Sequence, residues 1–174
     1  MKKDNWILKA FLLTFIIALL FNSASNLITN KINSLLILII VDLLFVLIGI
    51  IFDIIGTAAL TADESTFHSM SSKKIKGAKK AVYIIKNNST FSSICNDVIG
   101  DICGIVSGSV SAMIGLLLAN KLNISSIITI LLISSIISSL TVGGKAIGKK
   151  YAIKHSDSIV FEVAKLLNKF KKNK

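Results

Sequence analysis

Four aspartates interrupt or border strongly apolar stretches of this chain: Asp42, Asp53, Asp97 and Asp101. An ionised aspartate at the centre of a bilayer costs about 2.5 to 3.5 kcal/mol on insertion scales, so each of these side chains needs compensation. We expect no membrane-embedded lysine to be available as a partner. The remaining ways to compensate these carboxylates are protonation, contact with water, or a bound cation that moves. A bound and moving cation would mean a cation pathway through a membrane.

Helical spacing groups these carboxylates. Asp97 and Asp101 are four residues apart and share one helix face, whereas Asp42 and Asp53 are eleven apart and share another. Carboxylate, hydroxyl and amide oxygens suit hard cations such as Mg²⁺, Ca²⁺ or Na⁺ rather than soft metals. The residues expected to bind the metal are Asp53, Thr57, Asn96, Asp97 and Asp101. These residue types leave the choice among the three ions open, and we expect no resident cofactor.

A purely structural role is the alternative for two of these aspartates. Asp97 would cap the third apolar helix, and Asp42 would bind helix-end amides or extend toward the headgroups. Asp53 and Asp101 lie further along their helices, which favours ion binding over capping. Of the four aspartates, Asp42 therefore fits a structural role best.

Four apolar segments must position these side chains, at residues 6–21, 35–62, 97–119 and 124–142. Each is close to or above the roughly 20 residues that cross a bilayer as a helix. The chain is 53% hydrophobic, above the roughly 45 to 50% of soluble domains. The predicted fold class is an all-α integral membrane protein, multi-pass in the cell membrane, with residues 1–174 as one domain. Small residues after the first segment also allow its cleavage as a signal peptide.

All twenty basic residues are lysines, and their distribution predicts a topology. The N-terminal arm has three, the first loop one, residues 63–96 six, the next loop one and the tail nine. The positive-inside rule then places both termini in the cytoplasm. Residues 64–90 and 156–172 combine lysines with apolar residues at helical spacing, which predicts amphipathic helices on the membrane surface. Lysines without interleaved aromatic residues do not predict a nucleic-acid partner.

Other chemistry has no support in the sequence. No nucleophile stands at a plausible spacing from a base, and neither a phosphate loop nor a zinc signature occurs, so we do not expect an enzyme. Cys95 and Cys103 are expected to be packing thiols. Small residues recur every four positions in the third segment, at Gly100, Gly104, Gly108 and Ala112. This period allows close helix approach within one subunit or between two.

Several motifs follow one another in an order that carries a resemblance. Asp53–Leu60 is similar to S-G-x-E-T-A-L, Gly77–Asn87 to G-x-x-A-x-x-A-L-x-L-x-x-N, and Ile99–Asp101 to I-G-N. Thr141–Lys145 takes the place of G-E-x-x-P-K before a basic amphipathic segment. Over about residues 44–167 the chain thus resembles the membrane domain of the CNNM/CorB family of divalent-cation transporters.

This resemblance implies a homodimeric transporter whose polar site holds a largely dehydrated Mg²⁺. The family serine corresponds to Asp53, its first glutamate to Gly56, its asparagine to Asp101 and its last glutamate to Thr141, so acidity is kept but relocated. The CBS pair common in the family has no counterpart here, and nucleotide-sensing regulation is not expected. The expected partners are the lipid bilayer, a metal cation and a second copy. The alternative function is a non-transporting membrane protein, holin-like or an assembly partner of a larger complex.

Overall fold

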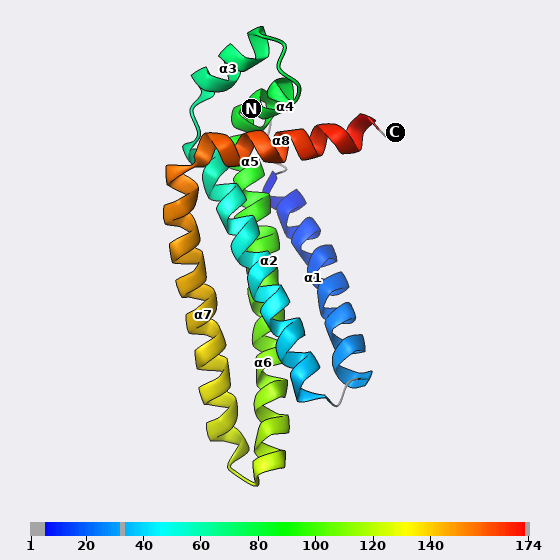
Figure 1. Ribbon diagram of the computed structural model, residues 1–174. Helices are drawn as coiled ribbons and strands as arrows, with labels where there is room; N and C mark the ends of the chain where they lie inside the picture. Colours follow the sequence, from blue (N-terminus) through cyan, green and yellow to red (C-terminus); the bar gives the residue numbers. More distant parts are fainter. Residues whose placement is uncertain (1–5, 32–33, 173–174) are drawn as a thin grey trace. The chain divides into compact units, whose positions relative to one another are not determined.

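The computed structural model describes residues 6–31 and 34–172 (Figure 1). Within these ranges every element is a helix and no strand is present. The α-helices are α1 (Trp6–Lys31), α2 (Leu35–Thr61), α3 (Glu64–Ser72), α4 (Ala78–Lys86), α5 (Asn88–Ser93), α6 (Asp101–Leu122), α7 (Ser126–Lys154) and α8 (Ser156–Lys172). A π-helix, η1 (Ile94–Gly100), joins α5 to α6.

Within residues 6–31 and 34–172, four helical stretches are long and apolar enough to cross a membrane: Leu8–Ser25, Leu35–Thr61, Asn88–Leu122 and Ser126–Lys154. For this described part of the chain, the predicted all-α class with four such helices is therefore confirmed. The third and fourth are longer than expected, beginning at residue 88 rather than 97 and ending at residue 154 rather than 142. Gly143 and Gly144 do not end α7, because an interior glycine costs only about 1 kcal/mol and the chain has no proline to break the helix.

The chain divides into two compact units, each built from two stretches that are distant in sequence. The first unit comprises the described residues up to Ile50 together with Val98–Lys145. The second comprises Ile51–Asp97 and the described residues from Ala146 onward. The single membrane domain expected from the sequence stays a prediction.

The first unit has a core of apolar side chains from α2, α6 and the end of η1. Its buried members are Leu38, Phe45, Val98, Ile102, Cys103, Val106, Val110 and Ile114. The rings of Phe21 and Phe45 meet edge to face, with centroids 6.0 Å apart. Gly49 permits close approach of α2 to α6, because a Cβ atom there would lie 3.3 Å from both the Cys103 Cβ and the Gly100 carbonyl oxygen.

The second unit has its own core, to which α3, α4 and α8 contribute. Its buried members are Ala58, Ala59, Phe67, Ala81, Ile84, Ile85, Ala152, Val160 and Ala164. Residues 64–90, expected as one amphipathic helix, form α3, α4 and the start of α5, with a turn at residues 73–77. Much of the apolar face of α4 is buried against α3 and α8 rather than left open for lipid. Helix α8 has the predicted bounds, 156–172.

Asp63 fixes the start of α3. Its carboxylate accepts hydrogen bonds from the Ser65 hydroxyl at 2.6 Å and the Ser65 backbone N–H at 3.0 Å. These bonds favour the charged form and lower the pKa of Asp63 below its usual value. The Asp63 backbone N–H donates to the Asp157 carboxylate at 2.9 Å, which ties the start of α3 to the first turn of α8.

Candidate cation site

Asp53 lies in α2 in the second unit, and only 3% of its surface is exposed. The Lys149 ammonium of α7 lies 3.8 Å from one of its carboxylate oxygens. The expectation that the aspartates would lack a lysine partner is therefore wrong for Asp53. The physical reason is that α7 continues past residue 142, which brings Lys149 into a helix facing α2.

Asn96 lies in η1, and its side chain is positioned by two contacts. Its amide nitrogen donates to the Ser92 hydroxyl at 3.2 Å. Its amide oxygen packs against Gly56 of α2, where an added Cβ atom would overlap that oxygen. Gly56 follows Asp53 by three residues, so Asn96 lies over the same face of α2 that carries Asp53.

The amide oxygen of Asn96 is buried and has no hydrogen-bond partner among the described residues. Leaving a buried acceptor unsatisfied costs about 1 to 3 kcal/mol, so such a group needs an explanation. An amide oxygen beside a carboxylate is a ligand for hard cations. In addition, π-helical segments occur frequently at functional sites, and η1 is such a segment.

The other predicted residues of this unit differ in exposure. Thr57 is half-buried, and it follows Asp53 by one helical turn on the same face of α2. Asp97 is exposed. It lies within the continuous helical stretch Asn88–Leu122, well after the first turn, so the structural alternative in which Asp97 caps the third apolar helix is wrong. Asp53 and Thr57 thus lie on one face of α2, and Asn96 lies over that face. Asp97 is adjacent to Asn96 in the sequence.

Asp101 belongs to the first unit, at the start of α6. Its side chain is 64% exposed and forms an ion pair with the Lys145 ammonium at 3.2 Å. Lys145 also donates to the Gly100 carbonyl oxygen at 3.5 Å. The expectation that the aspartates would lack a lysine partner is therefore wrong for Asp101 as well, again because α7 extends beyond residue 142. A single site that unites all five predicted residues stays a prediction.

Asp42, expected to have a structural role, is the most buried of the four aspartates, with 1% of its surface exposed. The Ser107 hydroxyl of α6 donates to its carboxylate at 2.5 Å. The second carboxylate oxygen is buried without a hydrogen-bond partner among the described residues. Asp42 therefore neither reaches the headgroups nor binds helix-end amides. Sequence reasoning missed Ser107, although Ser107 and Ser111, four residues apart, form a visible polar stripe on α6.

A small cavity of about 130 Å³ lies beside Ser107 in the first unit. Ser138 and Thr141 of α7 contribute hydroxyl groups to its lining, and Gly104 and Gly108 of α6 form part of its wall. A Cβ atom at either glycine would meet no atom within 4 Å. These two members of the small-residue face therefore do not serve close helix packing within the described part of this chain.

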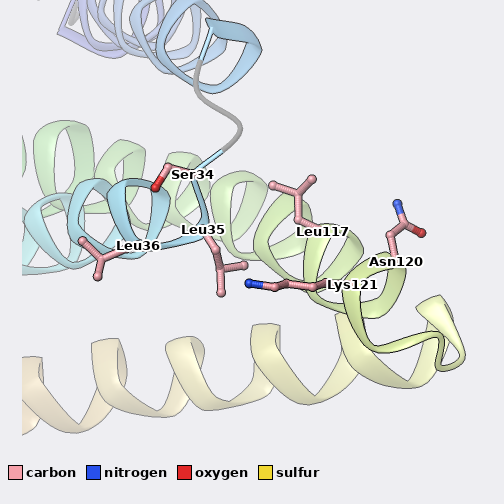
Figure 2. Close-up of a pocket in the computed structure, with 6 residues that line it drawn as sticks. All are labelled: Ser34, Leu35, Leu36, Leu117, Asn120 and Lys121. Atoms are coloured by element: carbon pink, nitrogen blue, oxygen red, sulfur yellow. The ribbon is translucent and has the colours of Figure 1, made fainter.

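A larger cavity of about 630 Å³ lies where α2 begins and α6 ends (Figure 2). Ser34, Leu35 and Leu36 line one side, and Leu117, Asn120 and Lys121 line the other. Figure 2 shows Lys121 extending toward Leu35. The lining contains a cation and no carboxylate, so it is unsuited to hold a metal ion.

Comparison with known proteins returned no match, whether to family models, to curated proteins or to solved structures. Within residues 6–31 and 34–172, no three His, Cys, Asp or Glu side chains converge. A cation held over α2 would therefore have fewer than three such side chains as ligands, with amide, hydroxyl and water oxygens completing its coordination.

Proposed function

We propose that this chain is a multi-pass protein of the cell membrane that carries a divalent cation, Mg²⁺, through a site over the Asp53 face of α2. The observation that supports this most directly is the buried amide oxygen of Asn96, which lacks a hydrogen-bond donor among the described residues. A cation over this face would satisfy that oxygen and would have the carboxylate of Asp53 as a further ligand. Thr57 is within one turn and would add a hydroxyl oxygen.

The small number of protein ligands agrees with the chemistry of Mg²⁺. This ion gives up its water reluctantly and is usually bound through one or two carboxylates while it keeps several waters. Lys149 would supply the compensating charge when no ion is bound. Its side chain is 52% exposed, so its ammonium can withdraw from Asp53 toward water as a divalent ion arrives.

Topology and assembly form part of the same proposal. Among the described residues, four helices suit a membrane span by length and composition, and the lysine distribution favours both termini in the cytoplasm. The resemblance to CNNM/CorB membrane domains favours a homodimer, and Gly104 and Gly108, with open space beside them, are available for contact with a second copy. Each charge that crosses a membrane gains or loses about 2.3 kcal/mol per 100 mV, so export of a divalent ion needs coupling to another gradient.

Flux through reconstituted vesicles tests the proposal. Vesicles that contain the protein and a trapped Mg²⁺ indicator should show uptake that Asp53→Asn and Asn96→Leu abolish without loss of folded protein. Glu162→Gln is the matched control, because it neutralises an exposed carboxylate of α8 outside the four apolar stretches. Absence of Mg²⁺, Ca²⁺ and Na⁺ flux with the correctly inserted parent protein would refute transport.

A second candidate is a non-transporting membrane protein that assembles with a larger complex or with copies of itself. The two ion pairs, Asp53 with Lys149 and Asp101 with Lys145, favour this role because they compensate two of the costly carboxylates without an ion. The double variant Asp53→Asn/Lys149→Gln separates the candidates. A scaffold should fold and assemble normally with it, whereas a carrier should fold and lose its flux.

A further inference from the structure

The turn between α3 and α4 forms a basic pocket with α8 in the second unit. This pocket has a volume of about 350 Å³. Four lysines line it: Lys74, Lys76, Lys79 and Lys80. Ser71 and Asn168 add polar side chains with hydrogen-bond donors, and no acidic residue lines the pocket. None of the four lysines forms an ion pair within the part of the chain that the structure describes.

Backbone geometry holds this pocket open. Lys74 has φ of 56° and Gly77 has φ of 96°, so the chain turns twice through left-handed conformations before α4 begins. A Cβ atom at Gly77 would lie 3.2 Å from Cγ of Lys165, which shows how closely the turn approaches α8. Gly77 provides no side chain to cap α4. The partial positive charge at the start of α4 therefore adds to the field of the four lysines.

We propose that this pocket binds the phosphate of an anionic phospholipid headgroup. Phosphate offers several acceptor oxygens, which match a lining of ammonium, hydroxyl and amide donors. Clusters of four to eight lysines next to the cytoplasmic end of a membrane helix attract anionic lipids in this way. The turn follows α2 after the short helix α3, so the inference rests on the proposed membrane insertion but is independent of cation transport.

Apolar groups beside the pocket favour a lipid over free phosphate. Ile75 lines the pocket between Lys74 and Lys76, and 40% of its surface is exposed. Leu166 and Leu167 of α8 are also exposed, close in sequence to Asn168 of the pocket. Free phosphate gains nothing from such side chains, whereas the glycerol and acyl portions of a phospholipid bury apolar surface against them.

Lipid binding to the full-length chain in neutral detergent tests this site, with native mass spectrometry as the readout. The ligands are phosphatidylglycerol, phosphatidylcholine and inorganic phosphate. The pocket variant replaces Lys74, Lys76, Lys79 and Lys80 with glutamine. The control variant replaces four exposed lysines outside the pocket, Lys86, Lys150, Lys154 and Lys169, and changes the net charge equally. A double variant, Lys76→Gln/Lys79→Gln, provides a milder change should the quadruple variant melt at a lower temperature.

The parent protein should prefer phosphatidylglycerol over phosphatidylcholine. The pocket variant should bind phosphatidylglycerol at least about tenfold more weakly, and the control should retain its affinity. Equal losses in both quadruple variants would overturn the inference, because they would indicate a diffuse effect of net charge. Displacement of the lipid by inorganic phosphate at similar concentration would also overturn it, in favour of a free-phosphate site. Flux measurements play no part in either outcome.

Discussion

The hydrogen bond between Ser107 and Asp42 should stabilise the first unit, and Ser107→Ala removes it. Both residues have only 1% of their surface exposed, and the bond joins their oxygens at 2.5 Å. A typical intramolecular hydrogen bond contributes about 0.5 to 1.5 kcal/mol net, and a buried acceptor left unsatisfied costs about 1 to 3 kcal/mol. We therefore expect Ser107→Ala to lower the free energy of unfolding by about 2 kcal/mol, or the melting temperature by about 4 to 8 °C.

A double-mutant cycle isolates this bond from other effects of the serine. Asp42→Leu removes the carboxylate with little change in volume, but it leaves the buried Ser107 hydroxyl without its acceptor and should itself cost about 1 to 3 kcal/mol. In the Asp42→Leu background, Ser107→Ala should cost less than about 0.5 kcal/mol. The coupling energy between the two positions should then be close to the cost of Ser107→Ala alone.

A native cysteine provides the assay. Cys103 is fully buried in the first unit, one helical turn before Ser107. A fluorogenic thiol reagent in detergent micelles should label it only as this unit unfolds on heating. The buried Cys95 of the second unit is replaced by alanine in every protein, so that the signal comes from Cys103 alone. If Ser107→Ala lowers the free energy of unfolding equally in the parent protein and in the Asp42→Leu background, the proposed contribution of this hydrogen bond is refuted.

Three further predictions concern glycines and a helix cap. Gly115→Ala should destabilise by about 1 to 3 kcal/mol in thermal unfolding, because its Cβ atom would lie 2.7 Å from a backbone atom of α7. Gly104→Ala meets no atom within 4 Å and should instead stabilise the helix by up to about 1 kcal/mol. Gly56→Ala should displace the Asn96 side chain and reduce Mg²⁺ flux while total helix content in circular dichroism is retained. The pKa of Asp63 is lowered in the folded protein, so its cap stabilises α3 fully at pH values above the usual carboxyl pKa. This stabilisation should be lost as the pH falls through the lower, folded pKa. Hydrogen exchange of α3 should show that loss in the parent protein and not in Asp63→Asn.

Hydropathy and lysine spacing predict the helical class and four apolar helices because both depend on local composition. Their bounds were less predictable. Gly143 and Gly144 suggest a helix end, yet α7 runs through them to Lys154, since glycine alone does not break a helix whose hydrogen bonds are otherwise complete. Because of this longer helix, the partners of two aspartates do not follow from the sequence. The lysine count places Lys145 and Lys149 in a basic tail, whereas in the structure both belong to α7 and pair with Asp101 and Asp53.

The candidate site was predictable in its residue types but not in their surroundings. Oxygen ligands in apolar helices are visible in the sequence, whereas burial depends on which helix covers each face. Asp42 is covered by α6 and reaches Ser107, while Asp97 is left exposed although it neighbours the buried oxygen of Asn96. The number of residues per turn decides which of two adjacent side chains in η1 points inward. A π-helix has more residues per turn than an α-helix, so an α-helical wheel does not predict that orientation.

The π-helix also affects how this chain is aligned with others. A hydrogen bond from residue i to i+5 closes a turn that holds one residue more than an α-helical turn, so η1 accommodates an insertion without a loop. Residues before Ile94 and after Gly100 are then one position out of register relative to a helix that is α-helical throughout. A comparison of Asn96, Asp97 and Asp101 with the polar positions of a helix that is α-helical throughout therefore needs a one-residue gap inside the helix.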